Sequence, residues 1–246
     1  MRLKLLAASL LLTVATSSLY YQKALANGIV PAPCVVGRTA APIGFWTWPA
    51  NAHVNIYLRE PDFSADYVSA VKVAVENWDA TAVENGSNVH FSFHGLTRDT
   101  NTAEGDLTII RGEVFNKKIK HLAVLEAHSL RSNRLIDYAL VIVDLRIRNP
   151  EVLTNIMAHE LGHSLGLLDC YACSHKGTAM SLLKAANEAN GIEGPTACDK
   201  SAVLAVYREL ALHVRSAPTT LTLNKLPATK REEPKADDTL VVKAPR

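Results

Sequence analysis

The alternation of apolar and polar positions along the chain predicts a sheet built from short strands. Apolar and polar residues alternate over 54–58 and again over 89–93, which is the pattern of half-buried strands. Two further strands are expected at 107–110 and at 122–125. The continuous apolar run at 139–143 is typical of a strand that is buried on both faces.

Three helices are expected around this sheet. Residues 64–83 place apolar side chains in one stripe at helical spacing, and residues 200–213 do the same near the end of the chain. Between them, Asn149 is suited to cap a helix, Pro150 to occupy its first position, and Gly166 to end it in a left-handed turn. The order of elements predicts an α/β (α+β) domain with a mixed sheet.

The two ends of the chain differ in composition from this central part. Arg2 and Lys4 precede a short apolar run and an Ala-Leu-Ala pattern, which together predict a signal peptide over 1–26. The apolar run is too short to favour the alternative, a membrane anchor. Residues 217–246 hold prolines and mixed charges without apolar periodicity, so a disordered tail is expected there. The folded domain is therefore predicted to span 27–216.

The predicted mature chain has a charge close to zero. The whole sequence carries a formal net charge of +2, and removal of the signal peptide takes away three basic residues and no acidic one, which leaves about −1. No basic stripe indicates a nucleic acid partner, and no later segment is long and apolar enough to span a membrane. We expect a secreted protein, extracellular or periplasmic, that acts as a monomer.

The four cysteines favour disulfide bonds, because an even number is usual in exported proteins. Cys34, Cys170, Cys173 and Cys198 allow three pairings, and the sequence does not choose between them. The spacing of Cys170 and Cys173 also fits a metal site or a redox pair, although no second pair of this spacing accompanies it. We expect two disulfides that hold the loop after the helix capped by Asn149.

The residues that carry chemistry lie at the end of that helix. His159 and His163 are four residues apart, so they share one helical face with Cβ atoms about 5–6 Å apart, close enough for both imidazoles to reach one zinc ion. Glu160 lies beside them, where it can hold a water as general base. Gly166 ends the helix and lets the chain turn back, so that Asp169 can supply the third ligand.

A helix that contains this motif by chance is the structural alternative. Short motifs have false positives, and the spacing of His159 and His163 alone would leave both interpretations open. Here the motif lies on a capped helix after a buried strand, and a helix-ending glycine and an acidic residue follow at fitting distances. This context favours the metal site.

The segment resembles the zinc-binding motif of the metzincin peptidases. The sequence HELGHSLGLLD at 159–169 is similar to the family pattern HExxHxxGxxH/D, and Met180 matches the methionine of the family's methionine turn. The resemblance covers about residues 51–212 and is greatest with the matrixin-like branch, on account of Trp78 and the strand start at 105–107. It implies a metzincin-like fold, a bound Zn²⁺ and a structural floor beneath the metal formed by Met180.

The chain departs from the family pattern at three points. Asp169 stands where most members have histidine. A minority of members, including the snapalysin-like peptidases, also have aspartate at this position. No tyrosine follows Met180 closely, so the tyrosine ligand of astacins is not indicated. The matrixin propeptide cysteine motif is absent, and the sequence around Cys34 does not match it.

These observations predict a secreted zinc metalloendopeptidase that hydrolyses peptide bonds of a peptide or protein substrate. Zinc would lower the pKa of its bound water, and Glu160 would take the proton. The resemblance implies that the substrate pairs with an edge strand, here residues 120–128. The alternatives are a secreted metzincin-fold binding protein without peptidase activity and a zinc hydrolase of another bond; an intact Glu160 argues against the first.

The other histidines are not assigned to a site. His90 and His94 lie on one strand about 13 Å apart, too far to share a metal, and are expected to face solvent. His121, His128 and His175 are isolated in the sequence, and no dense Asp/Asn loop indicates a calcium site.

Overall fold

The computed structural model describes residues 34–44, 46–99, 103–114, 121–129, 134–182, 186–216 and 238–243. The predicted signal peptide lies outside the described residues, as do residues 217–237 and 244–246 of the predicted tail. None of the helices in the described part of the chain combines the length and the apolar character needed to cross a bilayer.

A mixed sheet forms one layer of the domain, with strand order β2-β1-β3-β5-β4-β6. Strands β2, β1, β3 and β5 are mutually parallel, whereas β4 is antiparallel to β5 and β6 is antiparallel to β4. Every strand expected from the sequence is present. The strands are β1 (His53–Arg59), β2 (His90–Thr97), β3 (Asp106–Gly112), β4 (Ala123–Ser129), β5 (Tyr138–Asp144) and β6 (Asp238–Lys243).

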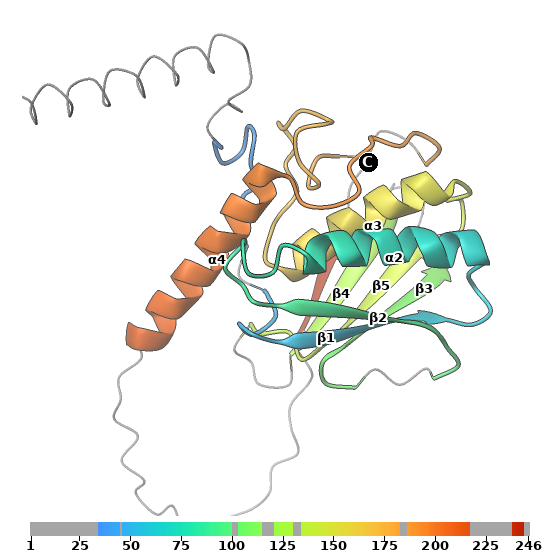
Figure 1. Cartoon of the computed structure of the whole chain (residues 1–246), viewed down its shortest axis with the longest axis horizontal. Helices are drawn as coiled ribbons and strands as arrows, with labels where there is room; N and C mark the ends of the chain where they lie inside the picture. Colours follow the sequence, from blue (N-terminus) through green and yellow to red (C-terminus); the bar gives the residue numbers. More distant parts are fainter. Residues whose placement is uncertain are drawn as a thin grey trace, which may run out of the picture. The chain divides into compact units, whose positions relative to one another are not determined.

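Helices α2 (Ala65–Asp79) and α3 (Pro150–Ser164) pack against each other and cover one face of the sheet (Figure 1). The apolar stripe of α2 is buried in this layer, and the indole nitrogen of Trp78 donates a hydrogen bond to the carbonyl of Ala158 in α3 (2.8 Å). Helix α4 (Ala197–Ser216) follows near the end of the chain. The predicted fold class, an α+β domain with a mixed sheet, is confirmed.

Both ends of α3 are fixed as its sequence predicts. The side chain of Asn149 caps the helix by accepting a hydrogen bond from the backbone N–H of Glu151 (2.9 Å), and Pro150 follows it. Beyond the other end Gly166 has φ +85°, and a Cβ at this position would lie 2.8 Å from Val206 of α4. Glycine therefore allows the chain to turn back directly after His163.

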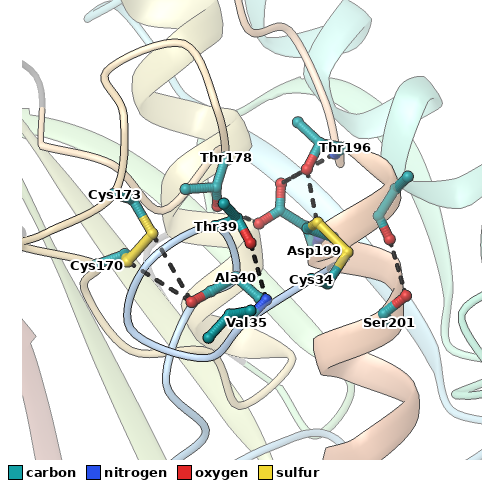
Figure 2. The surroundings of a disulfide bond; sticks show 12 residues. Cys34, Val35, Thr39, Ala40, Cys170, Cys173, Thr178, Thr196, Asp199 and Ser201 are labelled. Atoms are coloured by element: carbon teal, nitrogen blue, oxygen red, sulfur yellow. Dashed lines mark hydrogen bonds between the residues drawn. A yellow bond between two sulfur atoms is a disulfide. The ribbon is translucent and has the colours of Figure 1, made fainter. Parts of the chain in front are cut away.

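Two disulfide bonds are present. The sequence predicted that both would hold the loop after α3, and one of them does. Cys170 and Cys173 are bonded within the loop after α3. Cys34 is bonded to Cys198, which attaches the N-terminal segment to the start of α4 (Figure 2). The prediction that both bonds hold the loop after α3 is wrong for the second, because its partners come from opposite ends of the domain.

Part of the predicted tail belongs to the sheet. Residues Asp238–Lys243 form β6, which pairs with β4 from Asp238 opposite Ser129 to Lys243 opposite Val124. The segment contains the run Leu-Val-Val, which has high strand propensity within an otherwise polar and proline-containing stretch. The strand expected to be the edge of the sheet, β4, therefore has a neighbour on each side.

Candidate metal centre

The last turns of α3 and the loop after it bring the three predicted metal ligands together. His159 and His163 lie one turn apart, and their rings pack edge to face with centroids 4.6 Å apart. Oδ1 of Asp169 lies 3.1 Å from Nε2 of His159 and 3.6 Å from Nε2 of His163. Within the described part of the chain this is the one group of histidine, cysteine or acidic side chains placed to share a metal ion.

Backbone carbonyls fix the orientation of both imidazole rings. Nδ1 of His159 donates to the carbonyl of Ala179 (2.8 Å), and Nδ1 of His163 donates to the carbonyl of Leu167 (2.8 Å). A carbonyl oxygen only accepts hydrogen bonds, so each ring carries its proton on Nδ1. When the rings are neutral, as metal binding requires, the lone pair of each Nε2 points to the space shared with Asp169, as in metal sites whose histidines are held by outer partners.

Several buried polar atoms at this point have no protein partner. Nε2 of His163 and both carboxylate oxygens of Glu160 are buried without a hydrogen bond, although such groups are normally satisfied in native proteins. A tetrahedral zinc ion separates its ligand atoms by about 3.3 Å, close to the two distances from Asp169. An ion between the three ligands would satisfy His163, and water or substrate beside it would satisfy Glu160. The residues present thus fit a zinc ion.

The charges at the centre are strongly coupled. Burial opposes ionisation of Asp169, but the hydrogen bond with His159 and the positive charge of His159 and His163 outweigh it and lower its pKa to about 2. Burial likewise opposes protonation of His159, but the hydrogen bond to Asp169 and the charge of Glu160 together raise its pKa above the ordinary value. Without a metal, the two side chains form an ion pair in the place where the ion would bind.

Glu160 lies in the same buried region and has the properties of a proton acceptor. Its side chain is completely buried, and this burial raises its pKa, while the neighbouring charges of His163 and His159 act in the opposite direction. A carboxylate whose pKa is raised toward neutral can take up a proton and return it during one reaction.

Met180 packs directly against the turn of α3 between the two histidines. Its side chain is fully buried, and its Sδ occupies the space that a Cβ on Gly162 would need. The backbone around Met180 is tied to the loop after α3, because its carbonyl accepts a hydrogen bond from the N–H of Cys170 (2.9 Å). The absence of a side chain at Gly162 thus lets the methionine turn approach the metal-binding helix.

We expect Gly162→Ala to destabilise the protein by about 1–3 kcal/mol, because the added methyl overlaps with Met180 and has Trp78 close by. Helix propensity alone predicts the opposite sign, a gain of up to about 1 kcal/mol. Urea unfolding of the metal-free protein measures the difference. In a Met180→Ala background the same substitution should cost much less, and an equal cost in both backgrounds would show that the overlap is not the cause.

Asp199 organises the methionine turn, and the sequence analysis missed it. The buried carboxylate accepts hydrogen bonds from the hydroxyl of Thr178, from the N–H of Ala179 (2.9 Å) and from both N–H and hydroxyl of Thr196 (2.9 Å each) (Figure 2). Since the carbonyl of Ala179 holds the ring of His159, Asp199 acts on the metal centre through one residue. The Thr196-x-x-Asp199 spacing, a capping-box pattern, was the available signal.

Tyr171 is a second residue that the sequence analysis did not single out. Its hydroxyl lies 3.5 Å from Oδ2 of Asp169, while the side chain as a whole is 71% exposed. Partial burial and the charge of Asp169 raise the pKa of Tyr171, so its hydroxyl stays protonated. It is a hydrogen-bond donor at the border between the metal centre and solvent.

The remaining histidines that the structure describes take part in other contacts. His90 hydrogen-bonds to Asp79 and His94 to Asn55. His128 stacks on Tyr138. His175 lies in the loop before Met180, and its Nδ1 hydrogen-bonds to the carbonyl of Leu182, which follows Met180.

Comparison with known proteins found similarity among solved structures. No family model and no curated protein matches the chain. Among solved structures it is similar to archaemetzincin from Methanopyrus kandleri, with 12% sequence identity, a TM-score of 0.41, and coverage of 63% of this chain and 96% of that one. The chemistry of the metal centre is therefore inferred from the residues of this chain.

Proposed function

We propose that this protein is a zinc-dependent endopeptidase of the metzincin type, with His159, His163 and Asp169 as metal ligands and Glu160 as general base. The observation that carries the proposal is the buried group formed by these four side chains. Both Nε2 atoms face one carboxylate oxygen at 3.1 and 3.6 Å, and the adjacent carboxylate has no partner of its own. Three ligands and an open position are the arrangement of a catalytic zinc site.

The residues around the ligands have separate roles in this proposal. Zinc, when bound, supplies a Lewis acid that polarises a carbonyl and promotes deprotonation of water. Glu160 takes that proton and passes it to the leaving amine. The carbonyls of Ala179 and Leu167 keep both imidazoles in the tautomer that binds metal. The hydroxyl of Tyr171 is placed to donate a hydrogen bond to charge that develops next to Asp169.

The proposed compartment, metzincin branch and substrate class follow from features of the sequence. The cysteines that the structure pairs suit an oxidising compartment, which supports secretion after removal of residues 1–26. Trp78 and the strand start at 105–107 resemble the matrixin-like branch, to which we assign the chain, with Asp169 as a third ligand that only a minority of metzincins use. Peptides or unfolded proteins are the proposed substrates, because an extended backbone can pair with a strand whatever its side chains.

The proposal is tested with the mature chain, residues 27–246. We expect about one zinc ion per molecule, cleavage of an unfolded protein such as reduced casein, loss of cleavage on removal of the metal by a chelator, and recovery when Zn²⁺ is restored. Bound zinc is measured by atomic emission, and cleavage by the appearance of new amino termini. Zinc-loaded protein that cleaves no unfolded substrate would refute the peptidase and leave a binding protein.

A further inference from the structure

The outer side of β4 is occupied by a segment of the same chain. Strand β6 pairs with β4 along its whole length and runs antiparallel to it. Among the strands that the structure describes, β6 is the outermost at this edge of the sheet, and residues 217–237 separate it from α4 in the sequence. It therefore adds to the sheet as an extended peptide would, by main-chain hydrogen bonds to an open edge.

Backbone hydrogen bonds connect β4 to the metal-binding end of α3. Helix α3 packs against β4, and its last residue, Ser164, accepts a hydrogen bond from the N–H of Trp48 (3.3 Å). Residues 136–137 continue this connection by donating to the carbonyls of Thr47 (2.9 Å) and His128 (2.9 Å). Two short segments, 47–48 and 136–137, thus connect the end of α3 that carries the ligands to the end of β4 where β6 begins.

We propose that residues 238–243 act as an intramolecular competitor for the extended peptides that the proposed function would pair with the outer edge of β4. The inference rests on the proposed peptidase function for the identity of the peptides it excludes. A peptide aligned with the metal centre has to approach β4 on the side that β6 covers, because β5 occupies the other side. The tail then holds the enzyme in a state of low activity until it is displaced or removed.

The attachment of the tail makes it an effective competitor even if the strand itself binds weakly. Covalent attachment to the same chain gives a segment an effective concentration on the order of 1 mM. If the free hexapeptide binds with a Kd of about 0.1 mM, the ratio of chains with the attached segment bound to chains with it unbound is about ten. Displacement of the tail should therefore raise kcat/KM by roughly tenfold.

The alternative role of β6 is structural protection of a sheet edge. To separate the two, we compare the mature chain with Leu240→Pro/Val241→Pro, which removes two neighbouring strand N–H groups, one of which faces β4 whatever the hydrogen-bond phase. Arg231→Pro/Glu232→Pro, before the strand, is the matched control. A chain that ends at residue 237 is the second test form, and bound zinc and circular dichroism confirm that each form is folded.

Two readouts are used. The first is the anisotropy of a fluorophore-labelled peptide with the sequence of residues 238–243, measured in a Glu160→Gln background so that it is not cleaved. The second is kcat/KM for casein with Glu160 present. We expect the peptide to bind the strand-disrupted and shortened forms at least tenfold more tightly than the mature chain and the control, and kcat/KM to rise about tenfold in the same two forms.

The outcomes distinguish this inference from the proposed function. Equal peptide binding by all forms, or equal kcat/KM in active forms, would overturn the competition. Stronger peptide binding by the two altered forms without cleavage by any form would uphold the docking site and its occupation by the tail, and would refute the peptidase.

Discussion

Replacing Glu160 with glutamine is expected to lower kcat for peptide hydrolysis by about 10²–10⁴-fold, the usual contribution of a positioned general base. Glutamine has nearly the same volume and keeps hydrogen-bonding atoms in the buried site, but it cannot accept the proton of the attacking water. The ligands are unchanged, so bound zinc should stay at the wild-type level. The measurements are initial rates on a peptide substrate and the zinc content of the same preparations.

The exposed Glu151 in the first turn of α3 offers a matched control on the same helix. Glu151→Gln makes the same chemical change at the opposite end of α3. It should leave kcat within about twofold and lower the stability of the helix by less than about 1 kcal/mol. If Glu160→Gln kept wild-type kcat with a full complement of zinc, the proton acceptor would have to be another group, and the assignment of Glu160 would be wrong.

The parts of the site that the sequence predicted are those that local structure determines. His159, Glu160 and His163 are placed by the period of one helix, and Gly166 and Asp169 follow within a single turn of chain. Their relative positions depend on few degrees of freedom, so their spacing, together with the capped helix and the helix-ending glycine, was enough to predict them. The strands were predictable for a similar reason, since burial on one or both faces leaves a direct pattern in the sequence.

The parts that were missed depend on contacts between segments that are distant in sequence. Asp199 acts on His159 through Ala179, twenty residues before it, and nothing in the periodicity of either segment indicates the connection. The pairing of Cys34 with Cys198 spans 164 positions. Strand β6 has a polar, proline-containing environment in the sequence, and only the open edge of β4 gives it a partner. Tertiary context decided all three.

The charge of Asp169 sets the pH dependence of the metal-free centre. Its pKa is lowered from 3.8 to about 2, so its contribution to stability is present above the ordinary value and is lost as the pH falls toward 2. The pKa of His159 is raised, so its contribution is complete below about 6.5 and is lost as the pH rises through the raised value. Zinc has to displace this proton, and zinc affinity should therefore fall as the pH falls through the raised pKa of His159.

Asp169→Ala is expected to weaken zinc binding by at least about 100-fold, because loss of an outer partner alone costs roughly 10–100-fold and this change removes a ligand. Activity at limiting zinc should be lost in parallel. In the metal-free form the pKa of His159 should fall, since the hydrogen bond and the charge that raise it are gone. Competition with a chromophoric chelator measures zinc affinity, and NMR titration of the imidazole measures the pKa.

Asp169→His provides the control that separates the presence of a third ligand from its charge. A neutral imidazole should keep the zinc but leave the ion a stronger Lewis acid than a carboxylate does. Water at the metal would then lose its proton at lower pH, and the acid side of the activity profile should move to lower pH relative to the wild type, whose optimum is expected at neutral or higher pH. Retained zinc with an unchanged profile would mean that the carboxylate serves only as a ligand, and zinc affinity unaffected by Asp169→Ala would remove Asp169 from the site altogether.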